Sequence, residues 1–116
     1  MKHISKTSIV FLHIAAVLML TTSYVQAQDG NAAAGKALYA VCSGCHGADG
    51  LGMEATNAPR LQGQLSSYLI RQLEYYKSGV RGTHKGDVYG ATMKGMAATL
   101  PHDQAIRDVV AYIATL

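Results

Sequence analysis

The sequence predicts a small all-α domain with three main helices and two long loops. Three stretches of the 116-residue chain place apolar residues at spacings of three and four, as one face of a helix requires. No stretch alternates apolar and polar residues for long enough to make a convincing strand. Two Gly-rich segments, 47–64 and 79–99, separate the helical stretches. Loops of this length in a small domain are usually functional or wrap around something.

A separate segment precedes the predicted domain. Two lysines stand before an apolar run over residues 9–20, and the small residues of a cleavage site end at Ala27. This order of charged, apolar and small residues is typical of a secretory signal peptide. We therefore expect residues 1–27 to be an export leader and residues 28–116 to be the working domain. The alternative is a leader kept as an N-terminal membrane anchor, although a membrane span needs roughly 20 apolar residues.

The composition excludes several classes of protein. Seven acidic residues nearly balance the ten basic ones, two of which lie in the leader, so charge does not indicate a nucleic-acid partner. Two cysteines cannot build a disulfide-rich scaffold or complete a four-cysteine zinc site. The leader contains the only phenylalanine, Phe11, and the chain has no tryptophan. Because small domains have little stability to spare, we expect an apolar group other than side chains to complete the core.

The first predicted helix begins behind a cap at Asp29 or Asn31 and ends near Gly44. Side chains of Asp and Asn accept the free N–H groups of a first helical turn. Apolar residues then recur at helical spacing and predict one buried face. They are Ala34, Leu38, Val41, Cys42 and Cys45.

The second predicted helix begins at Ser66 or Ser67, either of which can cap it. It ends at Gly79, because glycine readily adopts the left-handed backbone conformation that commonly ends a helix. Helical spacing gives this helix an apolar stripe that faces the core. The stripe comprises Leu65, Leu69, Ile70, Leu73 and Tyr76.

The third predicted helix runs from about Pro101 to Thr115. Proline suits a first helical position, and Asp103 suits the positive end of the helix dipole. One face of this helix is consistently apolar. Its residues are Ile106, Val109, Val110 and Ile113.

The strongest motif in the chain is Cys42-Ser43-Gly44-Cys45-His46. Residues three and four apart share a helix face, so both sulfurs and the imidazole point the same way. Two such thiols can form thioethers to the vinyl groups of a haem while the imidazole reaches the iron, and C-x-x-C-H is the attachment signature of c-type haem. One alternative, a thioredoxin-like couple, expects alternating strands and helices. The other, half of a zinc site, needs two further ligands at metal spacing.

A haem iron ligated by His46 needs a ligand on its opposite face. Met93 and Met96 are candidates, as are His84 and His102, whereas Met53, only seven residues after His46, is too close to it in the chain. A thioether ligand stabilises ferrous iron and raises the reduction potential. Spacing alone does not choose between the two methionine sulfurs.

These residues together resemble the class I cytochromes c, nearest to one haem-binding half of the cytochrome c4 type or its single-haem relatives such as the c553 type. The resemblance covers residues 30–116 and implies the small class I cytochrome c fold around one covalently attached haem c. One C-x-x-C-H motif, not two, marks a departure from the two-haem proteins. The positions that carry the resemblance are Gly35, Tyr39, the C-x-x-C-H motif, 59–64, 68–69, 72–73, 79–81 and 93–113.

The resemblance also implies individual roles. It makes Cys42 and Cys45 the haem thioethers, His46 the proximal iron ligand and Met93 the distal ligand, with Met96 as packing and as the fallback ligand. The carbonyl of Pro59 would accept the N–H of His46 and so hold the ligand from behind. Further roles are weaker: Gly35 and Tyr39 would meet Tyr112 where the first and last helices cross, and Arg60, Gln64 or Tyr68 would contact the haem propionates.

The predicted function is periplasmic transfer of single electrons. Iron with both axial positions filled has no open site for substrate, and no catalytic acid, base or second metal is visible in the sequence. We expect redox-protein partners, with a dehydrogenase or cytochrome as donor and an oxidase or reductase as acceptor. The alternatives are a haem subunit held permanently in a larger oxidoreductase, and a ligand-sensing haem protein from which Met93 dissociates. Five basic residues between Arg71 and Lys94 are interpreted as a solvated face.

Overall fold

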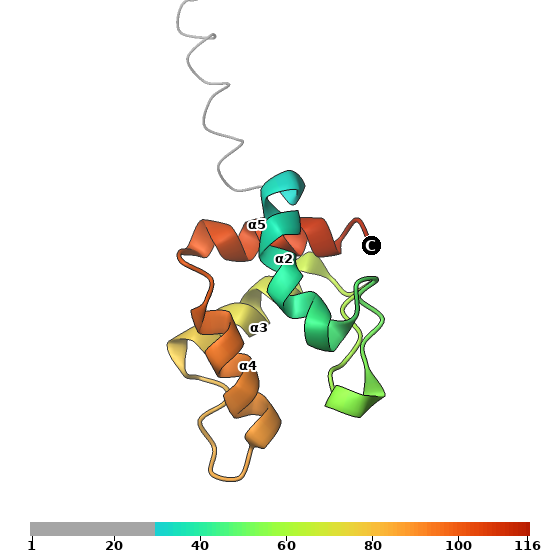
Figure 1. The fold of residues 1–116 in the computed structure, drawn as a ribbon. Coiled ribbons are helices and arrows are strands. Elements are labelled where there is room, and N and C mark those ends of the chain that lie inside the picture. Colours follow the sequence, from blue (N-terminus) through green and yellow to red (C-terminus); the bar gives the residue numbers. More distant parts are fainter. Residues whose placement is uncertain (1–29) are drawn as a thin grey trace, which may run out of the picture.

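The computed structural model describes residues 30–116, which form four α-helices and one short 3-10 helix (Figure 1). No named strand occurs in this range, so the predicted all-α fold class is confirmed. The predicted leader over residues 1–27 lies outside the described residues. The elements are α2 (Ala32–His46), η1 (Glu54–Thr56), α3 (Ser66–Ser78), α4 (Val88–Ala98) and α5 (Asp103–Ile113).

Helix α2 is capped by Asn31, which is one of the two residues predicted to cap it. Its side chain accepts hydrogen bonds from the N–H groups of Ala33 and Ala34 at 3.0 and 3.2 Å. The predicted end near Gly44 is wrong, because the helix continues to His46 and Gly47 takes the positive φ of 82° that ends it. The whole C-x-x-C-H motif is therefore helical.

The face that α2 buries differs from the predicted one. Gly35, Tyr39 and His46 are buried, whereas Ala34 is exposed and Val41 is 54% exposed. The predicted stripe followed the most apolar residues. The observed face is instead centred on a glycine and an aromatic ring, because α5 crosses the helix there.

The ends of α3 and α5 also depart from the predictions. Helix α3 ends as predicted at Gly79, with φ of 80°, but it starts behind Leu65, which is 75% exposed and offers no side-chain cap. Pro101 is not the first residue of α5. His102 follows it in an extended conformation and caps the helix, its Nδ1 accepting the N–H of Ala105 at 3.1 Å. Asp103 then lies in the first turn, as predicted.

Helix α4 is the main element that the sequence did not predict, because it lies inside the segment 79–99 that was interpreted as a loop. Asp87 caps it by accepting the N–H of Gly90 at 2.7 Å. Two glycines lie within the helix and two apolar residues of its first turn, Val88 and Tyr89, are exposed. Because the apolar residues of this helix form no clear stripe and glycine disfavours helix, hydrophobic periodicity does not predict it.

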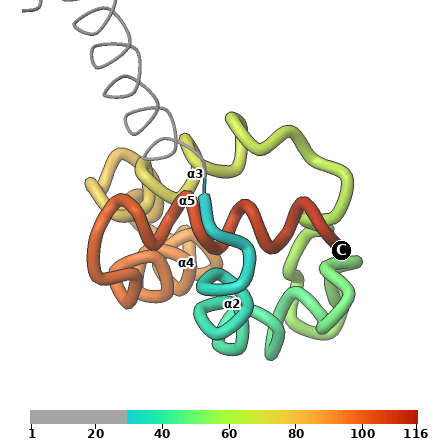
Figure 2. The backbone as a smooth tube through the Cα atoms, turned by 90° about the horizontal axis from the view of Figure 1, so that it is seen from above, coloured from blue at the N-terminus to red at the C-terminus, as the bar shows by residue number. Residues whose placement is uncertain are grey.

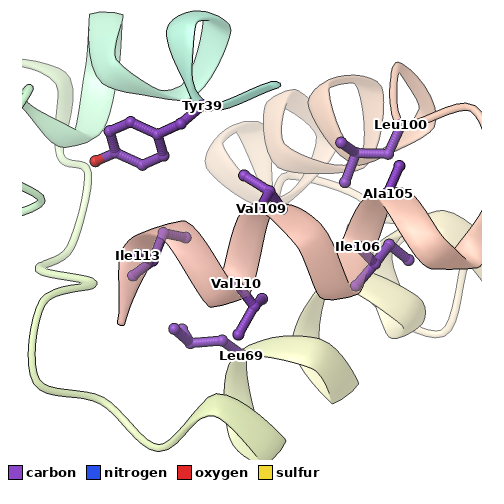
Figure 3. Packing of buried hydrophobic residues seen from close by; sticks show 8 residues of the cluster. All are labelled: Tyr39, Leu69, Leu100, Ala105, Ile106, Val109, Val110 and Ile113. Atoms are coloured by element: carbon purple, nitrogen blue, oxygen red, sulfur yellow. The ribbon is translucent and has the colours of Figure 1, made fainter. Parts of the chain in front are cut away.

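The core forms where α2 crosses α5, as Figures 1 and 2 show. The helices approach closely because Gly35 has no side chain: a Cβ there would overlap the carbonyl of Asp108. Beside this contact the rings of Tyr39 and Tyr112 lie 5.3 Å apart and tilted by 54°, so the crossing implied by the resemblance is present. The predicted apolar face of α5 is buried here together with Leu69 of α3 (Figure 3).

The helices pack in series, with α2 on α5, α5 on α3 and α3 on α4. Helices α2 and α3 both pack on α5, whereas α4 packs chiefly on α3. No helix within residues 30–116 is long and apolar enough to cross a bilayer.

The start of the described chain is held by a buried carboxylate on α5. Asp108 is 8% exposed, and its Oδ1 accepts the N–H of Asn31 at 2.8 Å and the side-chain N–H of Gln104 at 2.9 Å. The backbone N–H of Asn31 is the main cause that lowers the pKa of Asp108, and burial opposes it. The ionised carboxylate thus fixes the entry to α2.

We expect Asp108→Asn to destabilise the protein at neutral pH by about 1–2 kcal/mol, because the charged acceptor of two hydrogen bonds becomes a neutral amide oxygen. The folded pKa lies below the unfolded one. The contribution is therefore complete above the unfolded value of about 4 and disappears as the pH falls through the folded value. Chemical unfolding at pH 7 and pH 3 measures this, with Asp103→Asn on the exposed side of α5 as the control. An equal deficit at both pH values would show that the ionised carboxylate is not the cause.

Candidate functional site

His46 lies in the last turn of α2 with its ring buried. Its Nδ1 lies 2.8 Å from the carbonyl oxygen of Pro59. Because a carbonyl only accepts, Nδ1 carries the proton of this hydrogen bond, and the lone pair of a neutral ring remains on Nε2. The contact is the one that the resemblance implies. It orients the ring and leaves one nitrogen able to bind a metal ion.

The loop that carries Pro59 is folded back on the end of α2. The N–H of Gly52 donates to the carbonyl of His46 at 2.8 Å, and Met53 and Ala58 exchange two hydrogen bonds at 3.0 and 3.1 Å. Gly52 has a φ of 85°, and a Cβ there would lie 2.7 Å from the carbonyl oxygen of Ala58. Only glycine fits this turn, which sets the position of Pro59.

The two cysteines are free thiols with different surroundings, Cys42 partly buried and Cys45 exposed. Burial raises the pKa of the Cys42 thiol, and the neighbouring Cys45 raises it further. The attacking thiol of a thioredoxin-like couple needs a lowered pKa instead. Within residues 30–116 no group of three or more His, Cys, Asp or Glu is placed to hold a metal ion, so the zinc alternative finds no further ligands there.

A cavity of about 410 Å³ opens beside this motif. Helix α2 forms one wall with Cys42, Cys45 and His46. Helix α4 adds Met93 and Met96 to the lining. The volume is within the range of roughly 300–1,000 Å³ that cofactor pockets occupy. Much of the remaining lining is apolar and includes Leu61, Leu69, Leu73, Leu100, Val109 and Ile113.

The cavity separates the candidates for a distal ligand. Met93 and Met96 line it, whereas His84, His102 and Met53 do not. His102 is used as the cap of α5. The structure therefore brings His46 and the two methionines to one cavity and leaves the other three candidates outside it.

The candidates for contacting propionates divide in the same way. Gln64 and Tyr68 line the cavity, but Arg60 does not. The guanidinium of Arg60 instead donates to the backbone and side-chain oxygens of Gln62 at 3.0 and 2.7 Å. The sequence analysis missed Arg81, which does line the cavity. Its place in the 79–81 motif was the available signal, but the only role that the sequence analysis assigns to Arg81 is in the basic, solvated face.

A comparison with models of protein families identifies the family to which the chain belongs. The family model described as Cytochrome c matches residues 32–116, nearly all of the described chain. The chain belongs to the cytochrome c family. The predicted resemblance is thereby confirmed, and membership implies one covalently attached haem c.

Individual relatives agree with this family. Cytochrome c4 of Pseudomonas aeruginosa is 38% identical over 104 residues, which are 90% of this chain and 47% of the relative. Cytochrome c-554(548) of Halomonas halodenitrificans is 40% identical over 86 residues, covering 74% of this chain and 96% of the relative. The crystal structure of reduced recombinant cytochrome c4 from Pseudomonas stutzeri has a TM-score of 0.64 at 30% identity and covers 76% of this chain and 52% of the other. The chain spans about half the length of the curated cytochromes c4 that it matches.

The described residues fit a haem c. Two thiols and the lone pair of His46 lie on one side of a largely apolar cavity, and two thioethers reach it from α4. These donors match those that haem uses in proteins: thiols for its vinyl groups, and imidazole and thioether for its iron. A haem in this cavity would also be the apolar group that we expected to complete the core. The chain has no tryptophan, and its only phenylalanine lies in the predicted leader.

Proposed function

We propose that residues 28–116 form a periplasmic carrier of single electrons, and that residues 1–27 are the leader that exports it. The observation that carries this proposal is the cavity, which His46 and two methionines line together. An iron held by an imidazole and a thioether would have no open position for oxygen or substrate. The chemistry that haem c supplies is then the exchange of one electron with a partner protein.

We propose Cys42 and Cys45 as the thioether residues, His46 as the proximal ligand and Met93 as the distal ligand, with Met96 as packing. Pro59 orients His46 through the hydrogen bond at 2.8 Å, which fixes the coordinating nitrogen. A ligand held in this way moves little when the charge on the iron changes. The apolar wall also favours the less charged ferrous state and raises the potential.

The partners proposed are other redox proteins, with a dehydrogenase or cytochrome as donor and an oxidase or reductase as acceptor. Electron carriers dock transiently through interfaces that are typically below about 1,200 Å². Exposed apolar side chains on the cavity lining, Val41, Tyr68 and Tyr89, support docking at this edge.

The variant Met93→Ala tests the proposal. We expect the wild type to have a low-spin spectrum in both redox states, to titrate reversibly and to resist carbon monoxide. Met93→Ala is expected to become high-spin, to bind carbon monoxide stoichiometrically and to have a lower potential, because the thioether is lost. Met96→Ala is the matched control from the same cavity wall and is expected to stay low-spin. Spectroelectrochemistry of the three proteins makes the comparison.

The other outcomes each point to a different protein. An unchanged Met93→Ala with an altered Met96→Ala would move the ligand to Met96, and an unchanged double variant Met93→Ala, Met96→Ala would exclude methionine ligation. Binding of carbon monoxide by the wild type would favour the ligand-sensing alternative. Purification with a fixed ratio of another subunit would favour a permanent subunit of an oxidoreductase.

A further inference from the structure

Helix α4, which carries Met93, has few contacts that hold its first turn. It packs chiefly on α3, and the apolar side chains of Val88 and Tyr89 in that turn are exposed. Gly90 and Gly95 lie within the helix, and glycine disfavours helix. The start of α4 therefore depends on contacts from residues that precede it in the chain.

One of these contacts is made by Asp87, immediately before the helix. Its Oδ1 accepts the N–H of Gly90 at 2.7 Å, and its backbone carbonyl accepts the N–H of Ala91 at 2.9 Å. The carboxylate lies so close to the helix that a Cβ at Gly90 would overlap its Oδ2. The ion pair within 4 Å among residues 30–116 joins Lys77 to Asp103, so Asp87 acts as a helix cap and not as half of an ion pair.

The turn that follows α3 contacts the same residue of α4. Gly82 has a φ of 74°, and a Cβ there would overlap the carbonyl oxygen of Gly90 and lie 2.9 Å from the Cβ of Lys94. Gly90 is thus enclosed between the turn and the carboxylate of Asp87, and a side chain at either glycine would displace a neighbour. Gly82, Asp87 and Gly90 together form a clamp on the start of α4, hereafter the α4 clamp.

We propose that the α4 clamp positions the thioether of Met93, and that its loss lets Met93 leave the iron more readily. The inference rests on the proposed function, in which Met93 is the distal ligand. Gly90 lies three residues before Met93, and residues at this spacing are neighbours on one helix face. Asp87, Gly90 and Met93 all line the cavity. Asp87 acts on the iron only through the backbone of α4 and is therefore a positioning residue.

Binding of imidazole to the ferric, haem-loaded protein measures how readily Met93 leaves, because imidazole binds the iron only where the thioether is displaced. We expect Asp87→Ala to raise the apparent affinity for imidazole about fivefold, the effect of losing one typical helix cap. Asp87→Asn keeps an oxygen that can accept the N–H of Gly90, and its affinity is expected to stay within about twofold of the wild type.

Glycine variants test the clamp without changing its charge. Gly82→Ala and Gly90→Ala are both expected to raise the affinity for imidazole, because the new Cβ displaces a member of the clamp. The double variant Asp87→Ala, Gly90→Ala should gain less than the product of the two single effects, since both changes remove the same contact. Gly95→Ala is the matched control on α4, because a Cβ there meets nothing within 4 Å, and its affinity is expected not to rise.

Chemical unfolding of the same proteins separates positioning from general stability. If Asp87→Ala lowers the unfolding midpoint while its affinity for imidazole stays at the wild-type value, the clamp is only structural and the inference is overturned. Equal gains in Asp87→Ala and Asp87→Asn also overturn it, because the charge and not the cap would then be the cause. Equal affinities in the wild type and Met93→Ala would instead overturn the proposed ligation by Met93, since no thioether would be displaced.

Discussion

The double variant Cys42→Ser, Cys45→Ser is expected to carry no covalently attached haem. Serine oxygens do not form the thioethers that join thiols to vinyl groups, so the cofactor can no longer be linked to α2. The cavity of about 410 Å³ is bounded by several core residues and would be left without the group that fills it. An unfilled apolar cavity lowers the free energy of unfolding. We therefore expect the variant to be largely unfolded as well.

Intact mass and circular dichroism of the exported proteins measure both effects. Ser43→Ala is the control within the motif: its hydroxyl donates to the carbonyl of Ala40 at 2.8 Å and does not line the cavity. It is expected to keep its haem. A single Cys45→Ser protein should retain one thioether. A double variant with the same added mass as the wild type would contradict the assignment of both cysteines.

Gly35→Ala is expected to destabilise the haem-loaded protein by about 3 kcal/mol or more. The new Cβ would overlap the backbone carbonyl of Asp108, and a backbone atom cannot move aside as a flexible side chain can. The two helices would have to separate at the contact where Tyr39 meets Tyr112. The midpoint of chemical or thermal unfolding, followed by helical circular dichroism, reports the loss.

Gly44→Ala on the same helix is the matched control, because a Cβ there meets nothing within 4 Å. Its unfolding free energy is expected to stay the same or to rise by up to about 1 kcal/mol, since alanine favours helix more than glycine does. Equal losses in the two variants would mean that close approach at Gly35 is not what limits the crossing.

Local signals in the sequence predicted the parts of the fold that depend on nearby residues. The C-x-x-C-H spacing predicted one helical face for both cysteines and His46, and the motif is helical throughout. The buried face of α5 and the cap at Asn31 also follow from residues within a few positions of one another. Each of these features arises from helix geometry or capping, and both depend only on residues a few positions apart in the sequence.

The features that were missed depend on contacts between distant segments. Helix α4 has too weak a pattern to stand out, because it contains two glycines and its first turn is exposed, and it is held by packing on α3. Arg60 is the arginine that the resemblance implies at the propionates, yet it bonds its neighbour Gln62, whereas Arg81 lines the cavity from the turn after α3. The spacing of residues along the chain does not predict where these segments and side chains lie in the fold.

The packing of the helices in series has a consequence for cooperativity. His46 lies on α2, which packs on α5, whereas Met93 lies on α4, which packs chiefly on α3. A single metal ion held by both residues would cross-link the two ends of this series. Without the Met93 thioether, α4 would be held chiefly by its contacts with α3, so we expect it to melt first while the α2–α5 crossing stays intact.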